Sequence, residues 1–101
     1  MTTLIVTYPT REGARFDTRY YLARHIPLVR EKWMQHGLIS ARALLPDQES
    51  PAYLAVGLLE FTDGTALDRA LASPEAATIF GDVAAFTDIA PVALRCAEWR
   101  G

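Results

Sequence analysis

The sequence predicts one α+β domain in which strands and helices follow the order β-α-β-β-α-β. Two observations lead to this class. Short segments rich in β-branched and aromatic residues alternate with longer segments of helical periodicity, and turn-forming residues separate them. Half of the 101 residues are hydrophobic and 22% are charged, which is typical of a globular protein. A chain of this length buries one hydrophobic core, so we expect a single domain over residues 1–101.

The first strand and the first helix occupy the N-terminal part of the chain. Residues 4–8 (LIVTY) are mostly β-branched or aromatic and stop at a proline, which predicts a strand. The helix is expected to begin at Asp17, because its carboxylate can accept hydrogen bonds from the first free amides. It should run to about His36, where Gly37 ends it and where the imidazole acts as a C-terminal cap.

One stripe of this helix is apolar and is expected to face the core. Pro27 interrupts the helix, because it lacks an amide hydrogen and its ring collides with the carbonyl of Ala23. We therefore expect a kink or a break near His25 that leaves a carbonyl free. The residues of the stripe recur at helical spacing: Tyr21, Leu22, His25, Ile26, Val29 and Trp33.

The second half of the chain repeats the pattern with two more strands, a helix and a last strand. Residues 38–45 and 53–61 read as strands that are separated by the turn-forming segment PDQESP. Asp63 begins a second helix that Pro74 and Gly81 should divide, and residues 89–99 form the last strand. This order is the ferredoxin-like arrangement, a four-stranded antiparallel sheet with both helices on one face.

The other face of the sheet is expected to be apolar as well. In residues 53–61, Leu54, Val56 and Leu58 alternate with apolar residues of the helix-facing side. An exposed face of this kind exceeds the apolar surface usual for a soluble monomer. We therefore expect a homodimer in which two sheets close into a dimeric α+β barrel.

Charge and composition exclude several classes of partner. The formal net charge is −2, so the basic stripe that binds nucleic acid is missing. No apolar segment approaches the ~20 residues that span a bilayer, and no basic region precedes the short apolar run at the N-terminus. We expect a cytoplasmic protein that binds neither nucleic acid nor membrane. Cys96 is the only cysteine, which excludes an intrachain disulfide.

One set of residues, spread over nearly the whole chain, forms a pattern that is seen in a known protein family. Its most specific stretch is FDTRYYLARHIPL, and its residues are Tyr8-Pro9, Phe16-Asp17, Tyr20-Tyr21, His25, Pro27-Leu28, Trp33, Gly37-Leu38, Phe86-Thr87-Asp88 and Pro91. In this pattern the chain resembles the EthD family, small dimeric α+β barrel proteins named for a component encoded with bacterial ethyl tert-butyl ether degradation. The resemblance implies a ferredoxin-like subunit, a dimer, a small-molecule pocket between helices and sheet, and an auxiliary role beside an oxygenase in xenobiotic degradation.

His25 is the leading candidate for a catalytic residue. It is a titratable side chain on the apolar stripe, and Tyr21 lies one turn earlier, where its hydroxyl could orient a substrate oxygen. The alternative is that His25 bonds the carbonyl freed by Pro27 and only satisfies the core. Asp88, the acidic residue of the resemblance, could orient His25 or hold a substrate, although a role in capping or turn formation is commoner.

An aromatic set could line a pocket for an apolar ligand, although ordinary core packing would explain most of its members. Glu60 lies near a strand end, which favours exposure. No metal or cofactor is expected, because two histidines eleven positions apart on one helix cannot share an ion. The aromatic candidates for substrate binding are Tyr8, Phe16, Tyr20, Trp33, Phe80 and Phe86.

Two functions follow from these residues. The first is a cofactor-independent enzyme that performs acid–base chemistry on an apolar, oxygen-bearing compound, with His25 as proton carrier and Tyr21 as orienting group. The second is a non-catalytic protein that binds a hydrophobic metabolite and delivers it to an oxygenase. The sequence names neither the substrate nor the reaction.

Overall fold

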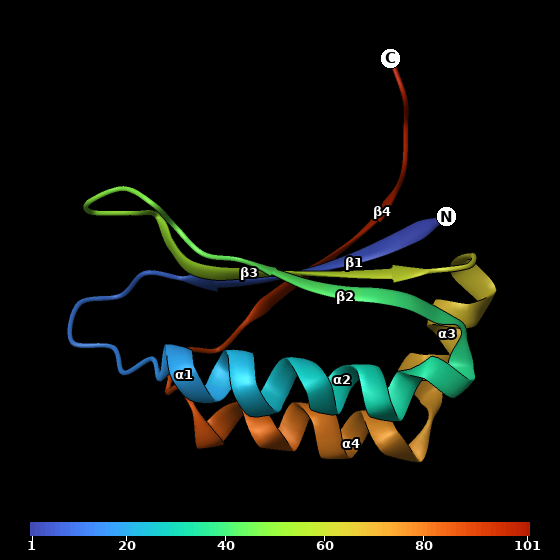
Figure 1. Ribbon diagram of the computed structural model, residues 1–101, viewed down its shortest axis with the longest axis horizontal. Coiled ribbons are helices and arrows are strands. Elements are labelled where there is room, and N and C mark those ends of the chain that lie inside the picture. Colours follow the sequence, from blue (N-terminus) through green and yellow to red (C-terminus); the bar gives the residue numbers. More distant parts are fainter.

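The computed structural model describes residues 1–101 and shows a four-stranded antiparallel sheet with all helices on one face (Figure 1). The strands lie in the order β2-β3-β1-β4, so the two central strands are the first and third along the chain. This arrangement confirms the predicted ferredoxin-like fold. None of the helices has the length and apolar composition needed to cross a membrane. The strands are β1 (Thr2–Pro9), β2 (Leu38–Leu44), β3 (Tyr53–Phe61) and β4 (Val92–Ala97).

The first helical segment begins and ends where the sequence predicts. The Asp17 carboxylate accepts a hydrogen bond from the Tyr20 amide at 3.0 Å, and Gly37 ends the segment at φ 93°, a backbone conformation that favours glycine. Four helical pieces follow one another between these two residues: α1 (Thr18–Tyr20), the π-helical η1 (Tyr21–His25), α2 (Ile26–Trp33) and the 3-10 helix η2 (Met34–His36).

Pro27 changes the helix in a different way from the predicted kink or break. The chain forms a π-helical turn over Tyr21–His25, and the Ile26 amide donates to the Tyr21 carbonyl five residues earlier. Pro27 then stands in the first turn of α2, directly after this wider turn. The backbone thus accommodates the proline by widening one turn.

The second helical segment is divided at the predicted residues. Asp63 accepts a hydrogen bond from the Ala66 amide at 2.8 Å and caps α3 (Gly64–Ala72). Pro74 begins α4, which ends at Gly81, and a short 3-10 helix η3 (Asp82–Ala85) follows.

The last strand is shorter than the predicted residues 89–99. Only Val92–Ala97 belongs to β4, because the preceding residues are held in a turn by the Thr87 hydroxyl. That hydroxyl donates to the Arg15 carbonyl at 2.6 Å and accepts from the Ile89 amide at 3.1 Å. Pro91 also lacks the amide that a sheet ladder needs.

The core lies between the sheet and the helices. The helix-facing side of β3 is buried from Ala55 to Phe61, as the alternation predicts, while Tyr53 at the strand's start is exposed. Two clusters of buried side chains fill the layer. One surrounds Trp33 of α2, and the other surrounds Phe86 after η3. The functional side chains described below lie where the two clusters meet.

No helix covers the other face of the sheet (Figure 1). Val92 and Leu94 of β4 are 58% and 61% exposed there, and Ile5 and Leu58 lie next to each other on the central strands. Glu60 on this face is half-buried rather than exposed, because Ser40 donates to its carboxylate at 2.9 Å and Arg42 at 3.1 Å. The expectation of an exposed Glu60 is therefore wrong.

Candidate functional site

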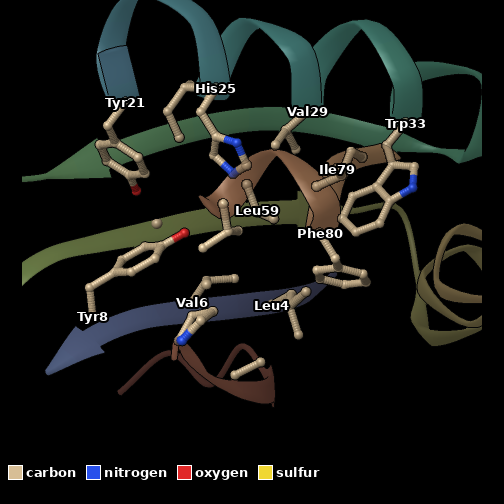
Figure 2. A pocket seen from close by; sticks show the side chains of 15 residues that line it. Leu4, Val6, Tyr8, Tyr21, His25, Val29, Trp33, Leu59, Ile79 and Phe80 are labelled. Carbon is tan, nitrogen blue, oxygen red and sulfur yellow. The ribbon is translucent and has the colours of Figure 1, made fainter. Parts of the chain in front are cut away.

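A cavity of about 190 Å³ lies between the helices and the helix-facing side of the sheet (Figure 2). Twelve of its 15 lining residues are hydrophobic. Apolar cavities of about 150 Å³ bind benzene in other proteins, so this space suits a molecule with a single ring and short substituents. The lining comes from β1, β3, the helix from Tyr21 to Trp33, the end of α4, η3, and the chain around the start of β4.

His25 brings a titratable group to the wall of this cavity. Its side chain is only 5% exposed, and Figure 2 shows the ring pointing into the cavity. The Nδ1 atom lies 3.0 Å from Oδ2 of Asp82, the first residue of η3. Burial lowers the pKa of His25, and the Asp82 carboxylate opposes this effect.

These contacts determine the state of the imidazole. A neutral ring carries one proton, and the acceptor at Asp82 places it on Nδ1. The Nε2 atom then keeps its lone pair and can accept a proton. The predicted alternative, a bond from His25 to a carbonyl freed by Pro27, is not formed, because the ring bonds Asp82.

Tyr20 holds Asp82 from the other side. Its hydroxyl donates to Asp82 Oδ1 at 2.8 Å, and this hydrogen bond raises the pKa of Tyr20. Tyr20 does not line the cavity, and its hydroxyl contacts the Asp82 carboxylate instead. Sequence reasoning missed Asp82, because it lies 57 residues from His25 and no local pattern marks the pairing.

Tyr8 and Tyr21 place two hydroxyl groups at the same end of the cavity as His25 (Figure 2). Their rings meet edge to face with centroids 5.5 Å apart, and Tyr21 stacks on His25 at 5.9 Å. Burial raises the pKa of Tyr21 to about 12 and raises that of Tyr8 further. Gly57 leaves room for this arrangement, since a Cβ there would lie 3.2 Å from the Tyr21 hydroxyl.

The predicted aromatic set divides into residues that line the cavity and residues that support its wall. Trp33 and Phe80 line the apolar end, together with Leu4 and Ile79, while Tyr8 lines the polar end. Phe16 and Phe86 are not lining residues, and they pack edge to face against Tyr8 at 5.4 and 5.6 Å. Phe16, Tyr20 and Phe86 thus lie outside the lining of this cavity, and a substrate-binding role for them stays a prediction.

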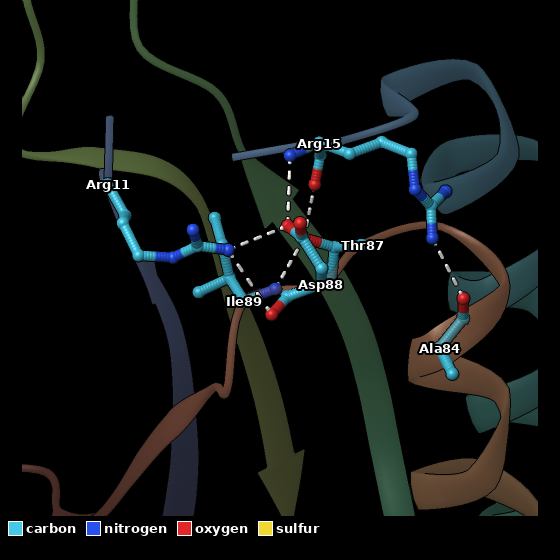
Figure 3. A network of polar contacts seen from close by, with 6 residues as sticks. All are labelled: Arg11, Arg15, Ala84, Thr87, Asp88 and Ile89. Carbon is cyan, nitrogen blue, oxygen red and sulfur yellow. Dashed lines mark hydrogen bonds and ion pairs between the residues drawn. The ribbon is translucent and has the colours of Figure 1, made fainter. Parts of the chain in front are cut away.

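Asp88 lies outside the cavity, and His25 is not its partner (Figure 3). Its carboxylate accepts a hydrogen bond from the Arg15 amide at 2.9 Å and pairs with Arg11 at 3.0 Å. The Arg15 amide and then Arg11 lower the pKa of Asp88. Asp88 thus ties the loop after β1 to the segment before β4, and the hypothesis that it orients His25 is wrong.

His36 is also placed differently from the prediction. Its Nε2 atom lies 2.7 Å from Glu75 of α4, so it links the two helical segments rather than only capping one. The two histidines therefore have separate carboxylate partners. No group of three or more His, Cys, Asp or Glu side chains is placed to hold a metal ion.

Comparisons with solved structures identify similar proteins. An EthD-like protein from Ralstonia eutropha JMP134 is 31% identical, covers 94% of this chain and 88% of its own, and has a TM-score of 0.80. SnoaB, a cofactor-independent oxygenase from Streptomyces nogalater, is 14% identical, with 99% and 94% covered and a TM-score of 0.70. A dimeric ferredoxin-like protein of unknown function from Jannaschia sp. CCS1 is 21% identical, with 96% and 98% covered and a TM-score of 0.68.

Comparisons with protein-family models and with curated protein sequences find no match. The two relatives below 25% identity share the fold with this chain. The Ralstonia protein, at 31% identity, is similar over 94% of this chain and 88% of its own length. The chain therefore belongs to the EthD-like family.

Proposed function

We propose that the protein is a cofactor-independent enzyme that moves a proton on a small, apolar, oxygen-bearing compound, in the cytoplasm and within a degradative pathway. One observation carries this proposal: His25 is held by Asp82 at Nδ1 and presents its ring to an apolar cavity. A histidine with a purely structural role in the core would be packed on all sides by protein atoms, whereas the His25 ring faces a cavity.

The arrangement supports general base catalysis. A neutral imidazole at cellular pH can accept a proton at Nε2, and the Asp82 carboxylate stabilises the imidazolium that forms. Tyr20 keeps the carboxylate in place through its hydrogen bond. Because the cavity is mostly apolar, little water competes for the proton.

The alternative function is binding and delivery of a hydrophobic metabolite to an oxygenase. The apolar character of the cavity favours this function. Twelve of its 15 lining residues are hydrophobic, and such side chains can bind a hydrophobic ligand without reacting with it. The two functions differ in whether a bound compound exchanges protons with the protein.

Deuterium incorporation from D₂O tests the proposal. The protein is incubated with three sets of small ring compounds, namely cyclic ketones, lactones and phenols, and exchange at carbon is followed by NMR. We expect at least one set to incorporate deuterium and His25→Gln to slow the exchange by roughly 10²- to 10⁴-fold. His36→Gln is the matched control, because His36 bonds Glu75 away from the cavity. Equal exchange rates for the wild type and His25→Gln with every compound would refute the catalytic proposal and support the delivery function.

We also propose that the protein is a homodimer that pairs through the uncovered sheet face. Leu44, Val92 and Leu94 are more than half exposed on that face, which is apolar surface of the kind that a second copy covers. The Jannaschia protein of the same fold is dimeric.

A further inference from the structure

Two tyrosine hydroxyls at the polar end of the cavity have no partner within the protein. Of the four tyrosines, only Tyr20 uses its hydroxyl in a hydrogen bond to another residue. Tyr8 and Tyr21 are each 1% exposed, and both line the cavity. Neither hydroxyl is a fully enclosed polar atom, so both keep access to the cavity and are free to bind an atom that enters it.

The two hydroxyls act as donors. Burial raises both pKa values, so Tyr8 and Tyr21 stay protonated at neutral pH. Figure 2 shows the hydroxyls turned toward the same end of the cavity, from β1 and from η1, with His25 beside them. Two donors and one base therefore surround a single small volume. This combination suits an oxygen that gains negative charge while a nearby atom loses a proton.

The remainder of the cavity restricts the ligand. No Arg, Lys, Asp or Glu is among the lining residues, so a ligand that enters as a carboxylate or phosphate meets no permanent positive charge. The end opposite the hydroxyls is formed by Leu4, Trp33 and Phe80. A second polar substituent there would lose its hydrogen bonds to water. The ligand thus enters neutral, with one oxygen and an otherwise apolar ring.

We infer that Tyr8 and Tyr21 form an oxygen clamp, and that the substrate is an enolisable cyclic ketone or the phenol of similar shape. This inference rests on the proposed function of His25. In the step that follows, Nε2 of His25 takes a proton from the carbon next to the carbonyl. The electron pair of that C–H bond forms the C=C bond of an enolate, and the carbonyl π pair moves to the oxygen. Tyr8 and Tyr21 donate hydrogen bonds to this oxygen, and Asp82 pairs with the imidazolium.

A phenol is a stable mimic of the enolate, so phenol binding tests the clamp. The probe is 3,4,5-trifluorophenol, whose ¹⁹F chemical shifts distinguish phenol from phenolate. The reference compound is 1,2,3-trifluorobenzene, the same ring without the hydroxyl. We expect the bound phenol to be ionised at a pH where the free phenol is mostly neutral, because its proton moves to His25. Tyr8→Phe and Tyr21→Phe should each weaken phenol binding by roughly tenfold or more and leave trifluorobenzene binding unchanged.

Tyr53→Phe is the matched control, because Tyr53 is exposed and does not line the cavity. Unchanged phenol affinity in both cavity variants would overturn the clamp, and so would equal affinities of the wild type for the two compounds. A tyrosine variant that no longer binds trifluorobenzene has lost the cavity itself. Gly57→Ala then takes the place of that variant in the test, because its methyl group displaces the Tyr21 hydroxyl while the tyrosine ring is kept.

The same titration separates the clamp from the proposed function. If His25 is the base and the clamp is wrong, His25→Gln abolishes ionisation of the bound phenol while the tyrosine variants bind it as the wild type does. If the clamp is right and His25 is not the base, the tyrosine variants weaken binding while His25→Gln leaves the bound phenol in the same ionisation state.

Discussion

Gly57→Ala should impair ligand binding without destabilising the fold. Gly57 is buried in β3, and its φ is not positive, so alanine can adopt the backbone conformation without strain. The added Cβ would lie 3.2 Å from the Tyr21 hydroxyl, whereas its contacts with Val6 at 3.8 Å are ordinary. The substitution therefore acts on one hydroxyl.

The expected magnitudes follow from two opposing effects. Replacing glycine by alanine at a compatible position stabilises a protein by about 0.4–1 kcal/mol through the unfolded chain. Moving the Tyr21 ring by a few tenths of an ångström costs about 0.5–1.5 kcal/mol when it takes the side chain off its rotamer. The net change in the free energy of unfolding should be within about 1 kcal/mol of zero. Losing one hydrogen bond worth about 0.5–1.5 kcal/mol should weaken trifluorophenol binding by about two- to tenfold.

Urea denaturation followed by circular dichroism measures the first quantity, and ¹⁹F NMR titration measures the second. Gly81→Ala is the matched control, because a Cβ there meets nothing within 4 Å. An unchanged affinity would refute the placement of the Tyr21 hydroxyl on the ligand. A loss of more than about 2 kcal/mol in stability would show that the cavity wall cannot shift as the argument requires.

Two further outcomes are expected. Burial lowers the pKa of folded His25 below the ordinary value of about 6.5, so the unfolded state binds more protons as pH falls through that value. The contribution of His25 to folding stability is therefore fully present above about pH 6.5 and is lost as the pH falls below that value. Between about pH 7.5 and 5.5, the melting temperature of His25→Gln should fall less than that of the wild type. Equal losses would contradict the neutral buried ring. Light scattering at micromolar concentration should give twice 11.2 kDa for the wild type. Leu58→Arg should produce monomers or aggregates. Leu22→Arg should not, because Leu22 is 42% exposed on the helical side rather than core-facing as predicted. A monomeric wild type would refute the pairing.

The parts of the fold that depend on local pattern could be predicted from the sequence. Alternation in residues 53–61 assigned both faces of β3, and Asp17 and Gly37 fixed the limits of the first helical segment. In both cases neighbouring residues contain the information. The same holds for His25 and Tyr21, whose place on the cavity follows from the periodicity of one helix.

The partner of His25 could not be predicted, because it depends on how α4 packs against α2. Asp82 and Asp88 both precede the last strand, and nothing in the sequence distinguishes the carboxylate that faces inward from the one that faces the loop. The six aromatic candidates show the same limit. An aromatic residue is expected to be buried. The sequence does not distinguish an aromatic residue that lines a cavity from one that packs behind the lining.

The π-helical turn explains why one helix can line the cavity from its polar end to its apolar end. Tyr21, His25, Val29 and Trp33 follow one another at intervals of four residues, and Figure 2 shows them side by side along the cavity. In a regular α-helix each interval of four overshoots one turn by about 40°, so the set would wind about 120° around the axis.

The wider turn at Tyr21–His25 holds more residues and takes up part of that rotation. The extra residue in this turn therefore keeps the side chains of Tyr21, His25, Val29 and Trp33 oriented toward the cavity. Deleting one residue from this turn would restore a regular helix and rotate Tyr21 by about 100° relative to Val29. The Tyr21 hydroxyl and the apolar side chains of Val29 and Trp33 would then lie on different faces of the helix. The length of this chain between Asp17 and Gly37 is thus a property of the site as much as of the fold.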